Sequence, residues 1–100
     1  MKIRLDVQAQ ADLRAIREYL LENASKVAAN KVRQHLRTRI QRLAKTPSIG
    51  IRTSDPNVRI LSPAKYPYRI YFAVDGDVIT ILHIRHTARR APAEEPAAGP

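Results

Sequence analysis

One dipeptide, Asp75-Gly76, leaves the chain little freedom in its fold, because it lies between two runs rich in β-branched and aromatic residues. Asp-Gly in that setting is typical of a β-hairpin, since a type I′ turn needs positive φ at both central residues. We therefore predict a hairpin over residues 66–86 with Asp75 and Gly76 as its loop. This register pairs Val74 with Asp77, Phe72 with Ile79, Ile70 with Ile81 and Tyr68 with His83.

The register divides the predicted hairpin into two chemically different faces, because side chains alternate along a strand. One face is almost wholly apolar and needs a cover: Ile70, Phe72, Val74, Ile79 and Ile81, with His83 beside them. The other face is mixed and is predicted to stay open to a partner: Arg69, Tyr71, Ala73, Thr80 and Leu82, with His86 in the same phase. On that face Arg69 is either a pre-organised cation or an ordinary solvated arginine.

Two amphipathic helices are predicted before the hairpin. The first runs from about Val7 to Glu22 behind Asp6 as N-cap, and Ser25 caps the second, which Pro47 and Gly50 end. Each helix has an apolar stripe at helical spacing. The stripes are Ala9, Leu13, Ile16 and Leu20 in the first helix, and Ala28, Val32, Leu36, Ile40 and Leu43 in the second.

Two short strands complete the predicted order, one at residues 2–5 and one at residues 58–62, with an irregular connection over residues 48–57. The result is an α+β domain of order β-α-α-β-β-β. An antiparallel helix pair packs on the apolar face of a small, mainly antiparallel sheet, because the stripes and that face bury each other. The domain is predicted to span residues 1–90, and the Pro, Ala, Glu and Gly of residues 91–100 predict a disordered tail.

Composition excludes several classes of protein and site. The 100 residues contain no cysteine, so a disulfide framework and a thiolate metal site are excluded. The three histidines lack a neighbouring acidic cluster, so no metal and no cofactor are predicted. No apolar run reaches membrane-spanning length, and no apolar block of a signal peptide opens the chain. A cytoplasmic protein is therefore expected.

The charge balance is strongly basic. Lys and Arg number 18 against 9 Asp and Glu, and Glu94 and Glu95 lie in the tail, so residues 1–90 carry 18 − 7, or +11. Such a balance favours a polyanionic partner, which is nucleic acid, a nucleoprotein machine or an acidic protein segment. The second predicted helix carries many of these cations, and they form either a nucleic-acid contact or a solvated face.

Four segments together resemble the RelE/ParE superfamily of toxins from type II toxin–antitoxin modules, and the ParE branch most closely. Each segment has the expected order and spacing, and the resemblance covers roughly residues 2–90. The segments are Ala9-x-x-Asp12-Leu13-x-x-Ile16-x-x-Tyr19, Leu43-Ala44-x-x-Pro47-x-x-Gly50, Tyr66-Pro67-Tyr68-Arg69-Ile70-Tyr71 and His86-Thr87-Ala88-Arg89.

The resemblance implies a small α+β toxin that a cognate, ParD-like antitoxin neutralises by wrapping around it. RelE-like members cleave messenger RNA on the ribosome with side chains of the open sheet face, whereas ParE-like members poison DNA gyrase. A ribonuclease reading assigns Arg69, His86 and Arg89 to catalysis. The paired strand lysines of such nucleases have no match in residues 58–61, which hold only Arg59, and no tyrosine or lysine follows Arg90.

The function predicted from the sequence is therefore a ParE-like toxin that inhibits gyrase by binding and has no catalytic residue. Its predicted partners are the antitoxin and gyrase, and a membrane is not among them. The partner-binding candidates are Arg59, Arg69, Tyr71, His86, Arg89 and Arg90. A ribosome-dependent messenger RNA endoribonuclease is the first alternative, with ribosome and messenger RNA as partners. A non-toxic basic nucleic-acid-binding module is the second.

Overall fold

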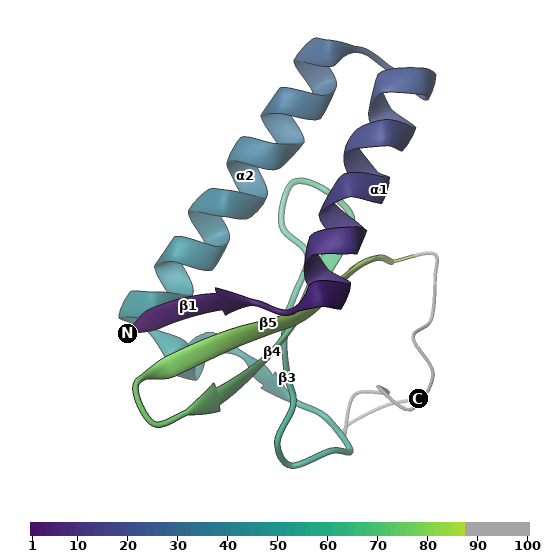
Figure 1. Ribbon diagram of the computed structural model, residues 1–100. Coiled ribbons are helices and arrows are strands. Elements are labelled where there is room, and N and C mark those ends of the chain that lie inside the picture. The colour runs from purple at the N-terminus through teal and green to yellow at the C-terminus, as the bar shows by residue number, and fades with distance from the viewer. Residues whose placement is uncertain (88–100) are drawn as a thin grey trace.

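A five-stranded mixed sheet covered on one face by two helices makes up the molecule (Figure 1). The computed structural model describes residues 1–87, so Arg89, Arg90 and the predicted tail at 91–100 lie outside the described residues. The strand order is β1-β5-β4-β3-β2. The elements are β1 (Lys2–Leu5), α1 (Val7–Asn23), α2 (Lys26–Lys45), the 3-10 turn η1 (Pro47–Ile49), β2 (Ile51–Arg52), β3 (Arg59–Leu61), β4 (Tyr68–Asp75) and β5 (Val78–His86).

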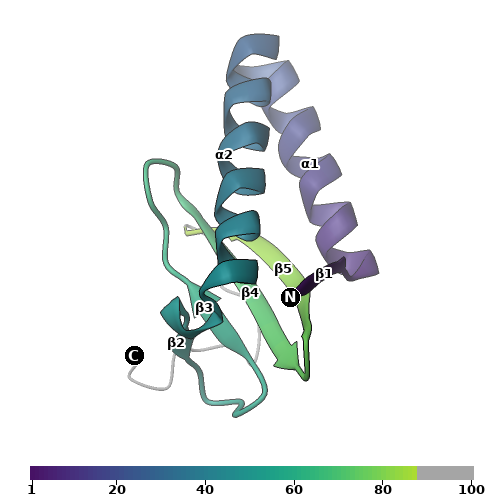
Figure 2. The ribbon, with the colours of Figure 1, turned by 90° about the vertical axis from the view of Figure 1, so that its left-hand side faces the viewer.

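The predicted β-α-α-β-β-β arrangement is confirmed, with the short strand β2 added in the connection that was predicted to be irregular. β1 pairs with β5 in parallel, and every other neighbouring pair is antiparallel. Figure 2 shows the two helices side by side on the same side of the sheet, with α2 nearer the β3 end. The sheet is therefore mixed, with its one parallel pair at the β1 edge.

The two helices begin differently. The backbone N–H of Ala28 donates to Ser25 Oγ at 3.0 Å, so Ser25 caps α2 as predicted. Asp6 occupies the N-cap position of α1, but its side chain makes no capping hydrogen bond. Instead the backbone N–H of Asp6 donates to the carbonyl oxygen of Ile81 at 2.9 Å, which ties the start of α1 to β5.

The main core lies between the helices and the sheet. α2 supplies Val32, Leu36, Ile40 and Leu43 as predicted, with Ala29 buried in place of the predicted Ala28. The hairpin supplies Ile70, Phe72, Ile79 and Ile81, all fully buried, so the predicted helix-facing side is confirmed for these four residues. Val74, predicted to share that side, is exposed at the end of β4.

The hairpin register differs from the predicted one by two residues. Asp75 pairs with Val78 and Val74 with Ile79, so the loop residues are Gly76 and Asp77 rather than Asp75 and Gly76. Gly76 has a φ of 61°, whereas Asp77 is not in the positive-φ region, which suits a type II′ turn with glycine first. Because the side-chain period of a strand is two, a shift of two keeps each side chain on its predicted face.

A β-bulge changes the phase of the second half of β5. Phe72 pairs with Ile81 but Tyr71 pairs with His83, so Leu82 is an extra residue in β5. Beyond it, Ile84 opposes the buried Ile70, and His86 opposes the buried Tyr68 on the helix-facing side. The predicted faces of His83 and His86 are therefore both wrong, because one extra residue exchanges the two faces of a strand.

The opposite face of the sheet is not left uncovered along its whole length. Val58, from the loop before β3, packs there with Ile60, Tyr71 and Leu82 in a second small cluster. Thr53 Oγ1 braces this loop, lying 2.9 Å from the carbonyl oxygens of both Asp55 and Val58. Tyr71 is on the predicted face but only 2% exposed, so the prediction of an open surface at this residue is wrong.

Candidate partner-binding site

The end of β5 lies against helix α1 rather than against another strand. β1 pairs with β5 only from Val78 to Ile81, which leaves the outer edge of the following residues without a strand neighbour. Asp12 of α1 takes that place, because its Oδ2 accepts the backbone N–H of Ile84 at 2.9 Å. The side chain is only 8% exposed, and its Oδ1 also accepts Gln8 Nε2 at 3.1 Å. A buried carboxylate thus fastens α1 to the sheet edge.

Two basic side chains of β5 converge on the same carboxylate. Arg85 Nη1 lies 3.8 Å from Asp12 Oδ1, and His83 Nδ1 lies 3.8 Å from Asp12 Oδ2. Both distances are too long for hydrogen bonds, and the distance from Arg85 is short enough for charge attraction where solvent is partly excluded. The carboxylate therefore orients two side chains that otherwise belong to the opposite face of the sheet.

That opposite face carries a small basic cluster, which we call the open-face cluster: Arg69, His83 and Arg85. Arg69 and Arg85 are direct cross-strand partners, and the rings of Tyr71 and His83 meet edge to face with centroids 6.2 Å apart. Like charges directly opposite one another destabilise a strand pair. Within residues 1–87 no carboxylate lies within ion-pair distance of Arg69. Arg69 is therefore the member of the cluster that is best suited to an anionic group of a partner.

A groove of about 280 Å³ lies on the other side of the β5 end, between α1 and β5. We call it the α1–β5 groove, and it is lined by Asp12, Ala15, Ile16, Tyr19, Tyr68, Ile84, Arg85 and His86. The rings of Tyr68 and His86 meet edge to face at 5.4 Å, and Tyr19 is 61% exposed at the rim. Burial raises the pKa of Tyr68, and the neighbouring Tyr19 raises it further. The groove thus joins apolar and aromatic walls to a basic rim.

The structure separates the residues that the sequence singled out. Arg69 lies on the open face as predicted, whereas His86 lines the α1–β5 groove on the helix-facing side. Tyr71 is on the open face but buried. Arg59 is the cross-strand partner of Phe72, next to Gly50 on the helix-facing side. The predicted candidates therefore do not form one continuous surface.

Sequence reasoning overlooked Asp12, Arg85 and the aromatic pair Tyr19 and Tyr68 as site residues. Asp12 did leave a signal, because a carboxylate three residues after Ala9 and four before Ile16 falls on the apolar stripe of the helix. Arg85 is the cross-strand partner of Arg69 because of the bulge, which the sequence does not predict. Tyr19 and Tyr68 come together from distant segments, so no local spacing marks them.

Two kinds of site were also sought among residues 1–87. That part of the chain contains no group of three or more His, Cys, Asp or Glu side chains placed to hold a metal ion. None of its helices is long and apolar enough to cross a membrane.

Comparison with known proteins places these features in a family. Residues 3–91 match the family described as the ParE toxin of the type II toxin–antitoxin system parDE. A solved structure titled "Chromosomal ParDE TA system from P. aeruginosa" is similar, with a TM-score of 0.76 and 27% sequence identity. That similarity covers 86% of this chain and 95% of the other. No curated protein matches the sequence. The chain belongs to the ParE toxin family of type II toxin–antitoxin systems.

Proposed function

We propose that this ParE-family protein is a bacterial toxin that inhibits DNA gyrase by binding it in the cytoplasm, and that a cognate antitoxin neutralises it. Family membership supports the toxin role, and the similar P. aeruginosa structure is titled as that of a chromosomal ParDE toxin–antitoxin system. The observation that carries the choice of binding over catalysis is the position of Arg69 and His86 on opposite faces of the sheet.

A metal-free ribonuclease must bring a base, an acid and a cation to one phosphodiester. Arg69 belongs to the open-face cluster and His86 lines the α1–β5 groove, so the cation and the acid–base group of the nuclease alternative point away from each other. His83 does share the face of Arg69, but it is drawn towards Asp12. The arrangement supports a binding surface better than it supports a site for RNA cleavage.

The α1–β5 groove is where we propose that the antitoxin docks. Its walls offer apolar and aromatic area, and Arg85 and His86 stand beside them. The described residues carry 16 Lys and Arg against 7 Asp and Glu, or +9. A segment with both acidic and apolar residues fits, because charge attraction speeds encounter and apolar burial slows dissociation.

The activity is tested with the purified full chain in two parallel assays, supercoiling by gyrase and cleavage of ribosome-bound messenger RNA. We expect loss of supercoiling and no RNA product. Arg69→Ala and His86→Ala should weaken inhibition in a graded way, because each removes one contact among several. Cleavage that either substitution reduced by about 10²–10⁴, with folding intact, would instead establish the nuclease alternative.

Antitoxin docking is tested by co-expression with the neighbouring small reading frame and by measurement of the affinity of the purified pair. Tyr19→Ala should weaken the complex by about 1–3 kcal/mol, because exposed aromatic anchors in grooves often dominate binding energy. Leu21→Ala is the matched control, since it removes a partly exposed apolar side chain of the same helix outside the groove. Equal effects of the two substitutions would remove the α1–β5 groove from the interface.

A further inference from the structure

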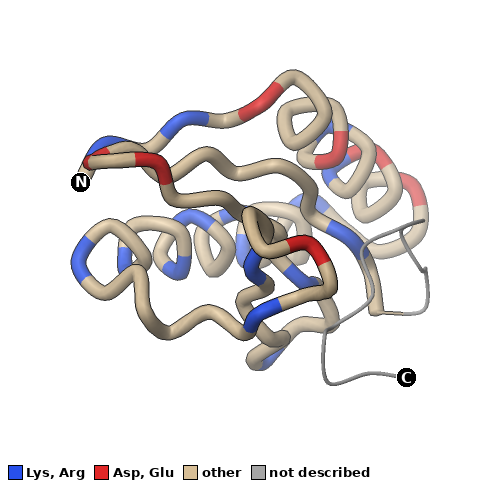
Figure 3. Tube along the Cα trace, turned by 90° about the horizontal axis from the view of Figure 1, so that it is seen from below, with Lys and Arg blue, Asp and Glu red and all other residues tan. Residues whose placement is uncertain are grey.

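Helix α2 carries cations without any acidic residue. Its sequence from Lys26 to Lys45 contains seven Lys and Arg and no Asp or Glu, whereas α1 contains both signs. In Figure 3 the coil of α2 is accordingly marked in blue alone. Opposite charges one turn apart stabilise a helix, whereas like charges at that spacing destabilise it. The imbalance of α2 therefore needs either a counter-charge from elsewhere in the fold or a partner.

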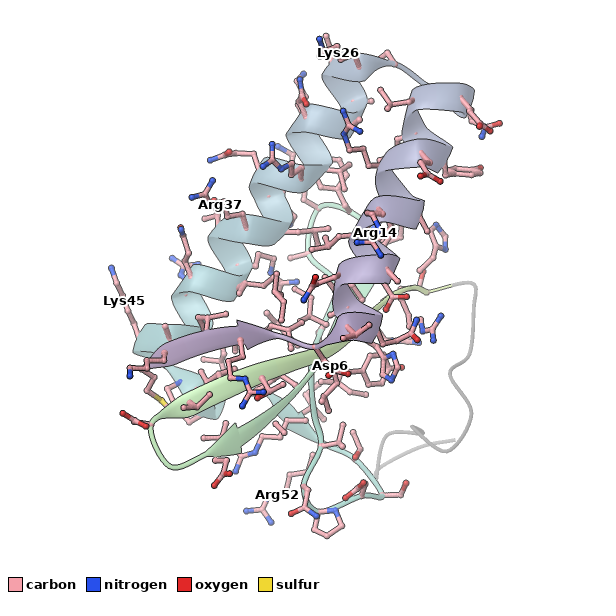
Figure 4. The ribbon with its side chains drawn as sticks, in the orientation of Figure 1. Asp6, Arg14, Lys26, Arg37, Lys45 and Arg52 are labelled. Atoms are coloured by element: carbon pink, nitrogen blue, oxygen red, sulfur yellow. The ribbon has the colours of Figure 1, made fainter. Side chains whose placement is uncertain are left out.

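Five of these cations project away from the core of the protein. The buried residues of α2 face the sheet, and at 3.6 residues per turn the opposite half carries what we call the α2 basic face. It consists of Lys26, Lys31, Arg37, Arg42 and Lys45, all exposed. Arg33 is also exposed but lies on the flank of α2 that faces α1. Figure 4 shows Lys26, Arg37 and Lys45 projecting from the outer side of α2, along its whole length.

Among residues 1–87 no carboxylate forms an ion pair with this face. Within residues 1–87, the ion pairs all involve Asp12, on the far side of α1. Arg39 is the one cation of α2 that turns back to the protein, where its Nη1 donates to the carbonyl oxygen of Ser62. Burial and the nearby Arg42 lower the pKa of Arg39, as expected where cations crowd together. The five cations of the α2 basic face repel each other and face solvent.

The side chains between the cations identify the chemistry of the partner. They are polar rather than apolar, namely Asn30, Gln34, Thr38 and Gln41, and Val27 in the first turn is the exception. A protein segment would find almost no apolar area to bury on this face. Phosphate oxygens, by contrast, are contacted by Arg and Lys together with Thr, Asn and Gln side chains.

We propose that the α2 basic face binds the phosphate backbone of duplex DNA without sequence preference. Twenty residues of helix span about 30 Å, close to the roughly 34 Å of one duplex turn. The face carries no aromatic side chain on which an unpaired base would stack, so a duplex fits better than a single strand. The inference goes beyond the proposed function and does not rest on it. A toxin that holds DNA would be concentrated where gyrase works.

The test measures binding of the full chain alone to a fluorescent 20-base-pair duplex of mixed sequence, by anisotropy over a series of salt concentrations. With about four phosphates neutralised, the logarithm of the association constant should fall with the logarithm of salt at a slope near −3.6. The variant Lys31→Gln, Arg37→Gln, Arg42→Gln should bind at least about tenfold more weakly at 0.1 M salt. Its slope should be about 2.7 units shallower, because three phosphate contacts are lost.

The matched control is Lys2→Gln, Arg4→Gln, Arg52→Gln, which removes the same charge from exposed positions on β1 and β2. It should keep the affinity to within about threefold. Circular dichroism melts establish that both variants fold. An equal loss in both variants would overturn the proposal, because net charge alone would then explain binding. Absence of binding at 0.1 M salt would also overturn it. The same holds if polyglutamate, compared at equal charge, displaces the fluorescent duplex as well as unlabelled DNA does. The assay contains neither gyrase nor antitoxin, so its failure and that of the proposed function are distinguishable.

Discussion

The two helices cover the same face of the sheet but are held there in different ways. α2 buries five apolar side chains, whereas the buried residues of α1 are Ala9 and the carboxylate Asp12. Apolar packing therefore anchors α2 and leaves its outward face free to carry cations without any acidic residue. α1 packs the partly buried Leu13, Ile16 and Leu20 against the main core and adds a directed polar contact to β5. The space beside that contact is the α1–β5 groove. Where apolar packing is thin, a buried polar group fixes the geometry that a partner meets.

The largest effect should come from the apolar anchor of α2. Leu36 is 2% exposed and belongs to the main core, so Leu36→Ala should lower the free energy of unfolding by about 2–5 kcal/mol. Leu21→Ala on α1, which is partly exposed, should change it by only about 0.5 kcal/mol. Urea denaturation measures both values. Similar losses for the two substitutions would contradict the placement of Leu36 in the main core.

The polar anchor of α1 is tested by Asp12→Ala, which leaves the buried N–H of Ile84 without its acceptor. We expect a loss of about 1–3 kcal/mol in unfolding free energy, because an unsatisfied buried donor keeps its full desolvation cost. Asp12→Asn should cost less, since the amide oxygen still accepts that hydrogen bond. Hydrogen exchange adds a local measurement: the amide of Ile84 should lose protection in Asp12→Ala, while β4 core amides change only with global stability. Unchanged protection of Ile84 would contradict the assignment of Asp12 as the anchor.

The helix starts give a smaller contrast. Ser25→Ala removes the capping acceptor of α2 and should cost about 1 kcal/mol. Asp6→Ala should cost less than about 0.5 kcal/mol, because the side chain of Asp6 caps nothing and the backbone N–H of the same residue makes the bond to Ile81. Thermal melts of both variants at one pH decide the order. A larger loss for Asp6→Ala would show that its charge, rather than a hydrogen bond, supports the start of α1.

The periodic features of the fold were predictable from the sequence, and the single-residue irregularities were not. The helix stripes and the helix-facing side of the hairpin follow from repeats that a whole element shares, so an error of two in the register left them intact. In Asp75-Gly76-Asp77 both adjacent pairs suit a two-residue loop, and only the structure selects Gly76-Asp77. The bulge at Leu82 leaves no local signal, yet it decides where His83 and His86 lie.

Contacts between distant segments were equally out of reach. Gly50 was predicted to end the second helix, but its place is set by Phe72: a Cβ at this position would lie 2.4 Å from the Phe72 Cζ atom. The candidate site depends on such contacts throughout, because Asp12 meets β5 and Tyr19 meets Tyr68 only after folding. Among the predicted candidates, Arg69 lies on its predicted face. Its strand, β4, has no extra residue that would exchange the two faces.

The α1–β5 groove also makes a contribution to stability that changes only at alkaline pH. Tyr68 lies in the α1–β5 groove, and its pKa is raised in the folded protein, first by burial and then by Tyr19. A raised folded-state pKa means that the neutral phenol is favoured on folding. The contribution is therefore fully present below the unfolded pKa of about 10 and is lost as pH rises through the folded value. At pH 7 this contribution is complete and does not vary with pH, so the melting temperature of Tyr68→Phe should decline less than that of the wild type only above about pH 10. Tyr66→Phe is the control, and circular dichroism melts from pH 8 to 12 make the measurement. If the melting temperatures of all three proteins declined in parallel, ionisation of Tyr68 would not be the cause of the alkaline loss of stability.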